Sequence, residues 1–201
     1  MQKQLFSTAT IFTLIRLITS PLVLPLLLVY FLPYNNLIIN SVLAFLFVAL
    51  SFTDFLDGYF ARKYNETSRV GAALDHIADK FLTTSTLIAL LTVHKIYFFW
   101  VIIFIGRDLF IMGLRLIALE HGFSVPVGYI GKLKTASIMA LITWIILNPY
   151  QKTTNSTEHI WQQIELILLT ISIALTLLSA YGYVRIFIQK FIQQELIEKK
   201  H

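Results

Sequence analysis

This sequence has no cysteine and few charged residues. Charged residues make up 13% of its 201 residues and hydrophobic residues 57%, whereas a soluble domain has about 25% charged residues. Without cysteine, neither a disulfide nor a thiolate metal site can form. Because the mean hydropathy is also high, at +0.73, the composition favours a membrane protein over a soluble all-helical protein.

Six apolar stretches follow one another along the chain, and each is close to the roughly 20 residues that cross a bilayer as a helix. They are residues 11–32, 37–62, 71–93, 96–120, 132–147 and 160–188. Backbone groups in lipid must bond internally, and no stretch alternates strictly between polar and apolar residues, so helices are expected. The sequence therefore predicts one all-α integral membrane domain over residues 1–201. No cleavable signal peptide is expected, because the first apolar stretch is too long.

Basic residues are concentrated in every second connection, which predicts the orientation in the membrane. On one side lie Arg62, Lys63, Arg69, Lys132, Lys134, Lys190, Lys199 and Lys200. The opposite connections contain only Lys95 and Lys152. We therefore expect the more basic side and both termini to face the cytoplasm. This placement also explains the net charge of +5 better than binding to nucleic acid does.

Four aspartates fall near membrane depth, where a carboxylate is costly unless its charge is compensated. Asp54 and Asp57 lie near the end of the second apolar stretch, and Asp75 and Asp79 lie near the start of the third. Helical spacing puts each pair on one face, together with small residues. Two adjacent antiparallel helices could thus bring four carboxylates into one cleft.

The basic residues expected near this cleft, Arg62 and Lys80, are too few to neutralise four carboxylates. Hard divalent cations would do so, because Mg²⁺ prefers carboxylate oxygens together with water and substrate phosphates. Paired metal ions also stabilise both oxygens of a phosphoryl displacement. We therefore expect a site for Mg²⁺ or Mn²⁺, with two ions, at Asp54, Asp57, Asp75 and Asp79. Gly58, Ala61 and Gly71 would leave room beside it for a bulky ligand.

These residues match the signature D-x₂-D-G-x₂-A-R-x₈-G-x₃-D-x₃-D at every spacing, and the chain thereby resembles the CDP-alcohol phosphotransferase family. The matching residues are Asp54, Asp57, Gly58, Ala61, Arg62, Gly71, Asp75 and Asp79. The resemblance implies six helices around a polar cavity open to the cytoplasm, often in a homodimer. It also implies that a CDP-linked lipid is the donor substrate.

The resemblance further assigns roles to the matching positions. All four aspartates would contact metal, with Asp79 also acting as the base that accepts a proton from the attacking hydroxyl. The nucleotide would be bound by Asp54, Gly58, Ala61, Arg62, Gly71 and Asp75.

The later half of the chain is similar to the branch of this family that uses CDP-diacylglycerol and glycerol 3-phosphate to form phosphatidylglycerophosphate. The matching segments in the later half are Gly106 to Asp108, Leu114 with Arg115, and Gly131 to Thr135, and the early segment Thr13 to Arg16 matches as well. Glycerol 3-phosphate is a dianion, so its pocket needs cations beyond the metals. We expect them to be Arg107, Arg115, Lys132 and Lys134. Position 108 is Asp where the branch usually has Glu, and Ser7 to Thr10 replace an N-I-P-N-like entry.

Other functions remain open from the sequence. Members of the same family with a different acceptor make cardiolipin, phosphatidylserine or inositol lipids. Membrane prenyltransferases also bind Mg-diphosphate with aspartates, but in two well-separated motifs. A cation transporter could use the carboxylates as a transit site.

The expected location of the protein is a bacterial inner membrane, with the active site facing the cytoplasm.

Overall fold

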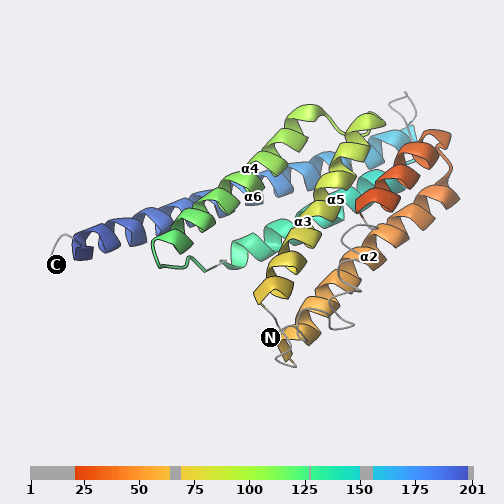
Figure 1. Ribbon diagram of the computed structural model, residues 1–201. Coiled ribbons are helices and arrows are strands. Elements are labelled where there is room, and N and C mark those ends of the chain that lie inside the picture. Colours follow the sequence, from red (N-terminus) through yellow and green to blue (C-terminus); the bar gives the residue numbers. More distant parts are fainter. Residues whose placement is uncertain (1–20, 64–68, 127, 150–155, 199–201) are drawn as a thin grey trace, which may run out of the picture. The chain divides into compact units, whose positions relative to one another are not determined.

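The computed structural model describes residues 21–63, 69–126, 128–149 and 156–198, without the side chains of residues 54–79, 156–158 and 195–198. Every regular element in these ranges is helical, which confirms the all-α prediction for this part of the chain (Figure 1). Residues 21–31 are helical. The further elements are η2 (Leu32–Tyr34), α2 (Leu37–Lys63), α3 (Arg69–Thr92), α4 (Phe98–Glu120), α5 (Tyr129–Leu147) and α6 (Ser156–Glu198).

The helix ends follow from local chemistry. Asn35 ends η2 in a left-handed conformation, with φ of 51°. Asn36 precedes α2, and its Oδ1 accepts hydrogen bonds from the backbone N–H groups of Ile38, at 2.9 Å, and Ile39, at 3.4 Å. Asparagine is a preferred N-cap because its side chain satisfies amides that have no partner within the helix. The start of α2 is thus encoded in the residues directly before it.

Helices α3 and α4 end in the same hydrogen-bonding motif. After α4, Gly122 has φ of +73° and donates its N–H to Leu119 O, while Phe123 N donates to Ala118 O at 3.0 Å. After α3, His94 has φ of 58° and donates to Leu91 O, and the next N–H donates to Leu90 O. Both ends are Schellman motifs, for which glycine is the usual left-handed residue.

Helix α6 extends well beyond the expected range of 160–188. The composition turns polar after residue 188, where the predicted apolar stretch ends. The residues that follow are mostly good helix formers, and neither glycine nor proline occurs between residue 188 and the end of α6. Polarity therefore marks where the apolar stretch ends, and the helix continues past it.

The chain divides into two compact units. The first comprises residues 1–97 and 142–158, and in it α2 and α3 contact each other. Its described core includes Leu28, Phe47 and Leu90, all fully buried. A polar contact in the same unit holds the residue after α5: Asn148 O accepts from Lys95 Nζ, at 2.6 Å, and from Asn40 Nδ2, at 3.3 Å.

The second unit comprises residues 98–141 and 159–201. Its core cluster joins residues of α4 and α6 with the connection after α4, and consists of Ile111, Ala118, Val125, Tyr183 and Phe187. Lys190 of α6 fixes the connection further by donating from Nζ to Ser124 O at 2.7 Å. The connection that leads into α5 is thus packed against the later part of α6.

Two described helical segments, Tyr129–Leu147 and His159–Gln194, are long and apolar enough to cross a membrane. In the most apolar stretch of 18 residues, only 33% of the first segment and 17% of the second are buried. The core helix of a soluble protein is largely buried, so this exposure favours contact with lipid. Shorter apolar helices occupy Pro21–Tyr34, Leu37–Thr53 and Lys80–Thr92. The expected number of six spans and the cytoplasmic cavity stay predictions.

Candidate active site

The four aspartates lie on the two helices that contact each other in the first unit. Asp54 and Asp57 fall in the second half of α2, and Asp75 and Asp79 fall in the first half of α3. The chain between these helices is short, spanning residues 64–68. Figure 1 shows α2 and α3 next to each other, and their contact agrees with the arrangement that the sequence predicts.

The side chains of residues 54–79 lie outside the described part of the structure. Metal binding by Asp54, Asp57, Asp75 and Asp79 therefore stays a prediction. Nucleotide binding by Gly58, Ala61, Arg62 and Gly71 stays a prediction for the same reason. Among the residues that are described, no group of three or more His, Cys, Asp or Glu could hold a metal ion. The donor chemistry of the aspartates is the reason to place a metal there.

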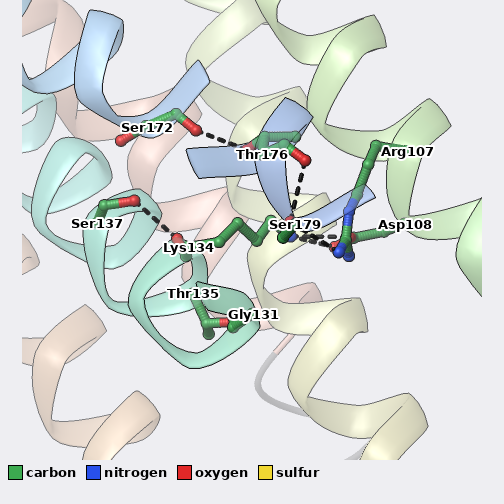
Figure 2. Close-up of polar contacts among 9 residues, drawn as sticks. All are labelled: Arg107, Asp108, Gly131, Lys134, Thr135, Ser137, Ser172, Thr176 and Ser179. Carbon is green, nitrogen blue, oxygen red and sulfur yellow. Dashed lines mark hydrogen bonds and ion pairs between the residues drawn. The ribbon is translucent and has the colours of Figure 1, made fainter. Parts of the chain in front are cut away.

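A cationic cluster lies in the second unit, where α4, α5 and α6 each contribute side chains (Figure 2). Its centre is the carboxylate of Asp108 on α4. Lys134 of α5 donates from Nζ to both oxygens of this carboxylate, at 2.7 and 2.8 Å. Arg107 of α4 donates from Nη1 to Asp108 Oδ1 at 2.9 Å. One carboxylate therefore binds two cations that come from different helices.

Helix α6 contributes a row of hydroxyl side chains at spacings of four and three residues, Ser172, Thr176 and Ser179, all buried. Arg107 donates from Nη2 to Ser179 Oγ at 2.9 Å. The Ser179 hydroxyl donates in turn to Thr176 O, also at 2.9 Å. Since the hydroxyl proton is directed to that carbonyl, the oxygen is oriented to accept from the guanidinium.

The cations of this cluster are less exposed than the carboxylate. The side chains of Lys134 and Arg107 are 6% and 14% exposed, against 26% for Asp108. A buried charge is strongly unfavourable unless it is paired and hydrogen-bonded, and the carboxylate meets that need. The Nε atom of Arg107 is buried and has no acceptor within the described residues.

The structure brings together two of the four cations expected at the acceptor phosphate, Arg107 and Lys134. Lys132 is exposed on α5; two residues along a helix correspond to a turn of about 200°, so it lies on a different side of α5 from Lys134. Arg115 is partly buried, two turns and about 12 Å further along α4 from Arg107. Binding of the acceptor phosphate by Lys132 and Arg115 stays a prediction, and both residues lie further from the centre of the cluster.

Sequence reasoning did not identify the hydroxyl residues of α6. A signal for them is present, because the serines and threonine at positions 172, 176 and 179 recur at helical spacing within an apolar segment. Asp108, at the position where the related branch usually has Glu, forms an ion pair with Lys134 on α5.

Together, the aspartate signature on two adjacent helices and the separate cationic cluster are typical of enzymes that act on phosphorylated substrates. The model of the CDP-alcohol phosphatidyltransferase family matches residues 6–178. The chain belongs to this family and is a transferase.

Curated relatives agree with this placement. A protein of Salmonella choleraesuis (strain SC-B67) is 36% identical over 150 residues, which cover 72% of this chain and 79% of the relative. A protein of Shigella flexneri serotype 5b (strain 8401) is 33% identical over 185 residues, covering 89% and 93%. One of Escherichia coli (strain K12) is 35% identical over 150 residues, covering 72% and 79%. Each of these is named CDP-diacylglycerol–glycerol-3-phosphate 3-phosphatidyltransferase.

Proposed function

We propose that this protein transfers the phosphatidyl group of CDP-diacylglycerol to a hydroxyl of glycerol 3-phosphate, releasing CMP and forming phosphatidylglycerophosphate. The observation that carries the proposal is the relationship to proteins named for this reaction, which extends over 93% of the length of one relative. The cationic cluster supports the choice of acceptor, because a phosphate monoester needs a positively charged site.

The aspartates of α2 and α3 form the donor side of the proposed site. Carboxylate oxygens suit hard divalent cations, so Asp54, Asp57, Asp75 and Asp79 fit a pair of Mg²⁺ or Mn²⁺ ions. When bound, these ions would supply the positive charge that stabilises the diphosphate and the departing CMP. The nucleotide would lie against Gly58, Ala61, Arg62 and Gly71, where small residues leave space for it.

The group transfer balances without a covalent enzyme intermediate. The acceptor hydroxyl attacks the lipid-side phosphorus, and the bond from this phosphorus to the oxygen of CMP breaks. Asp79 accepts the hydroxyl proton, for which it must come within about 3 Å of the hydroxyl oxygen. On α3, Asp79 lies one turn beyond Asp75, so a base and a metal ligand are one turn apart on the same helix.

The acceptor phosphate is assigned to Arg107, Lys134, Lys132 and Arg115. Arginine suits this role because its guanidinium forms paired hydrogen bonds with phosphate oxygens, and lysine adds a point charge. The buried Nε of Arg107 has no acceptor among the described residues, so it is a donor that a phosphate oxygen could use. Arg107 and Lys134 form the centre of the assignment because they are already in contact with the same carboxylate.

The proposal includes a place in the cell. The long exposed apolar helices support a protein that is embedded in a bacterial inner membrane by six helices. Both termini and a polar cavity would face the cytoplasm, in line with the basic connections. The resemblance to the family supports a homodimer.

The test uses the full chain purified in detergent, with CDP-diacylglycerol and glycerol 3-phosphate. CMP release should require both substrates and a divalent cation, should stop on addition of EDTA, and should resume when Mg²⁺ or Mn²⁺ is added in excess. Labelled serine, inositol phosphate, phosphatidylglycerol and glycerol replace glycerol 3-phosphate in parallel reactions. CMP release with one of these acceptors and none with glycerol 3-phosphate would contradict the proposed acceptor. Ion flux in proteoliposomes without CMP release would indicate a transporter.

A further inference from the structure

Asp108 joins residues that are distant in sequence but adjacent in the second unit. Its oxygens accept hydrogen bonds from Arg107 and from Lys134, a lysine that lies 26 residues further along the chain and that contacts both oxygens. Hydrogen bonds between ionised groups are stronger and more directional than those between neutral groups. The carboxylate therefore restricts both cations to one relative position.

Ser179 restricts the guanidinium of Arg107 from the other side. Nη1 binds Asp108 and Nη2 binds Ser179, so the two terminal nitrogens are held by partners on different helices. Because the guanidinium is planar and rigid, fixing these two nitrogens also fixes its plane and the direction of its Nε–H. The hydrogen bond from Ser179 to Thr176 O keeps the serine oxygen in place.

We infer that Asp108 and Ser179 are positioning residues for the acceptor phosphate: they orient Arg107 and Lys134, and do not bind the phosphate themselves. This inference rests on the proposed function, which assigns the two cations to glycerol 3-phosphate. Asp108 is unsuited to direct contact because its charge has the same sign as that of the phosphate. It acts through the cations that it holds.

Asp108 also compensates the cluster when no acceptor is bound. It lies between two largely buried positive charges and so reduces their mutual repulsion. With it, the cations keep a fixed arrangement before the substrate arrives. Such preorganisation lowers the cost of binding, so the loss of Asp108 should weaken acceptor binding more than it slows the chemical step.

The experiment compares Asp108→Asn, Asp108→Glu and Ser179→Ala with the wild-type protein. Steady-state kinetics are measured with glycerol 3-phosphate varied at saturating CDP-diacylglycerol, and then with CDP-diacylglycerol varied at saturating glycerol 3-phosphate. We expect Asp108→Asn to raise the KM for glycerol 3-phosphate about tenfold, the equivalent of one lost charge-assisted interaction, and to leave the KM for CDP-diacylglycerol within about twofold. Asp108→Glu should stay within about threefold of wild type, because the carboxylate is retained.

Ser179→Ala should raise the KM for glycerol 3-phosphate about two- to fivefold, since it removes one neutral acceptor from Arg107. Its matched control is Ser137→Ala. The Ser137 hydroxyl also bonds to a carbonyl oxygen three residues earlier in its own helix, Lys134 O, at 2.8 Å. The control should leave both KM values unchanged.

Asp108→Asn removes a carboxylate that the buried Lys134 contacts, which threatens folding. The double variant Asp108→Asn with Lys134→Met is therefore compared with Lys134→Met alone, so that the effect of the carboxylate on Arg107 is measured in a protein without that buried ammonium. The double variant should have a higher KM for glycerol 3-phosphate than Lys134→Met. Melting temperatures in detergent report folding for every variant.

Three results would overturn the inference. The first is an unchanged or lower KM for glycerol 3-phosphate in both Asp108 variants that lack the carboxylate, each compared with the protein that differs from it only at position 108. The second is a fall in kcat and melting temperature with both KM values unchanged, which would indicate a structural ion pair. The third is a KM for Asp108→Glu as high as that of Asp108→Asn. Wild-type protein that releases no CMP with glycerol 3-phosphate would instead reject the proposed function, and the inference with it.

Discussion

Two groups of charged residues lie on the helices of this apolar chain, and they differ in how their charge is compensated. The acids of α2 and α3, from Asp54 to Asp79, are four carboxylates, and the sequence predicts two cations, Arg62 and Lys80, beside their cleft. We propose that metal ions and substrate supply the missing positive charge. The cations of the second unit instead have a carboxylate of the protein itself, since Asp108 binds both Arg107 and Lys134.

The difference suggests a division of labour. A group that depends on bound ions for its compensation is suited to chemistry in which charge changes, because the ions polarise the reacting phosphate. A group compensated within the protein is suited to binding, because its geometry is set before the substrate arrives. Substitutions in the acidic group should therefore lower kcat, and substitutions in the cationic group should raise KM for the acceptor.

The largest effect is expected for Asp79→Asn. The amide cannot accept the hydroxyl proton, so turnover should fall about 10³-fold, within the usual range for a general base. Binding of CDP, measured by equilibrium dialysis with Mg²⁺, should change little because Asp54, Asp57 and Asp75 remain. Glu120→Gln, at an exposed acid at the end of α4, is the control and should keep wild-type turnover. Equal loss of turnover and of CDP binding would limit Asp79 to a metal-binding or structural role.

The next effect concerns the cationic group. Arg107→Gln removes the charge and the paired donors, so the KM for glycerol 3-phosphate should rise about 10- to 100-fold, as expected for loss of a hydrogen bond between charged groups. The KM for CDP-diacylglycerol should stay within about twofold. Arg185→Gln, at an exposed arginine of α6, is the matched control and should show neither change. A parallel rise in both KM values would contradict the division between the two groups.

A third substitution separates binding from stability. Lys95 in the first unit donates to a neutral acceptor, the backbone carbonyl of Asn148 directly after α5, at 2.6 Å. A cation is favoured at a helix C-terminus. Lys95→Met should lower the free energy of unfolding by about 1–2 kcal/mol and leave the KM for both substrates unchanged. Lys95→Arg retains a charged donor and should recover part of the loss, as measured by denaturation in detergent.

The sequence was sufficient for those features that depend on residues close together along the chain. The bounds of α2 and the aspartate spacing are both local, since each depends on residues within a few helical turns. The cationic cluster is not local. Arg107, Lys134 and Ser179 lie on three different helices. Lys134 joins the cluster because its side of α5 is buried, whereas Lys132 lies on an exposed side. No periodicity within a single helix contains that information.

Helix ends were predictable where the sequence has a glycine or a capping residue, and less so elsewhere. Gly122 ends α4 near the expected residue, whereas α6 continues past residue 188 because no residue there interrupts a helix. At the end of α3, a histidine occupies the position that glycine usually takes. The hydrogen bonds of the motif are formed all the same, from His94 N to Leu91 O and from Lys95 N to Leu90 O.

That histidine gives the smallest expected effect, and a change in the stabilising direction. The left-handed conformation costs a residue with a side chain roughly 1–2 kcal/mol relative to glycine, and His94 has φ of 58°. His94→Gly should therefore raise the free energy of unfolding, by about 0.5–1 kcal/mol after the added freedom of glycine in the unfolded chain is subtracted. Gly122→Ala, at the matching position after α4, should change it in the opposite direction by a similar amount. If both substitutions destabilise the protein equally in detergent, the side chain of His94 contributes contacts that outweigh its backbone strain.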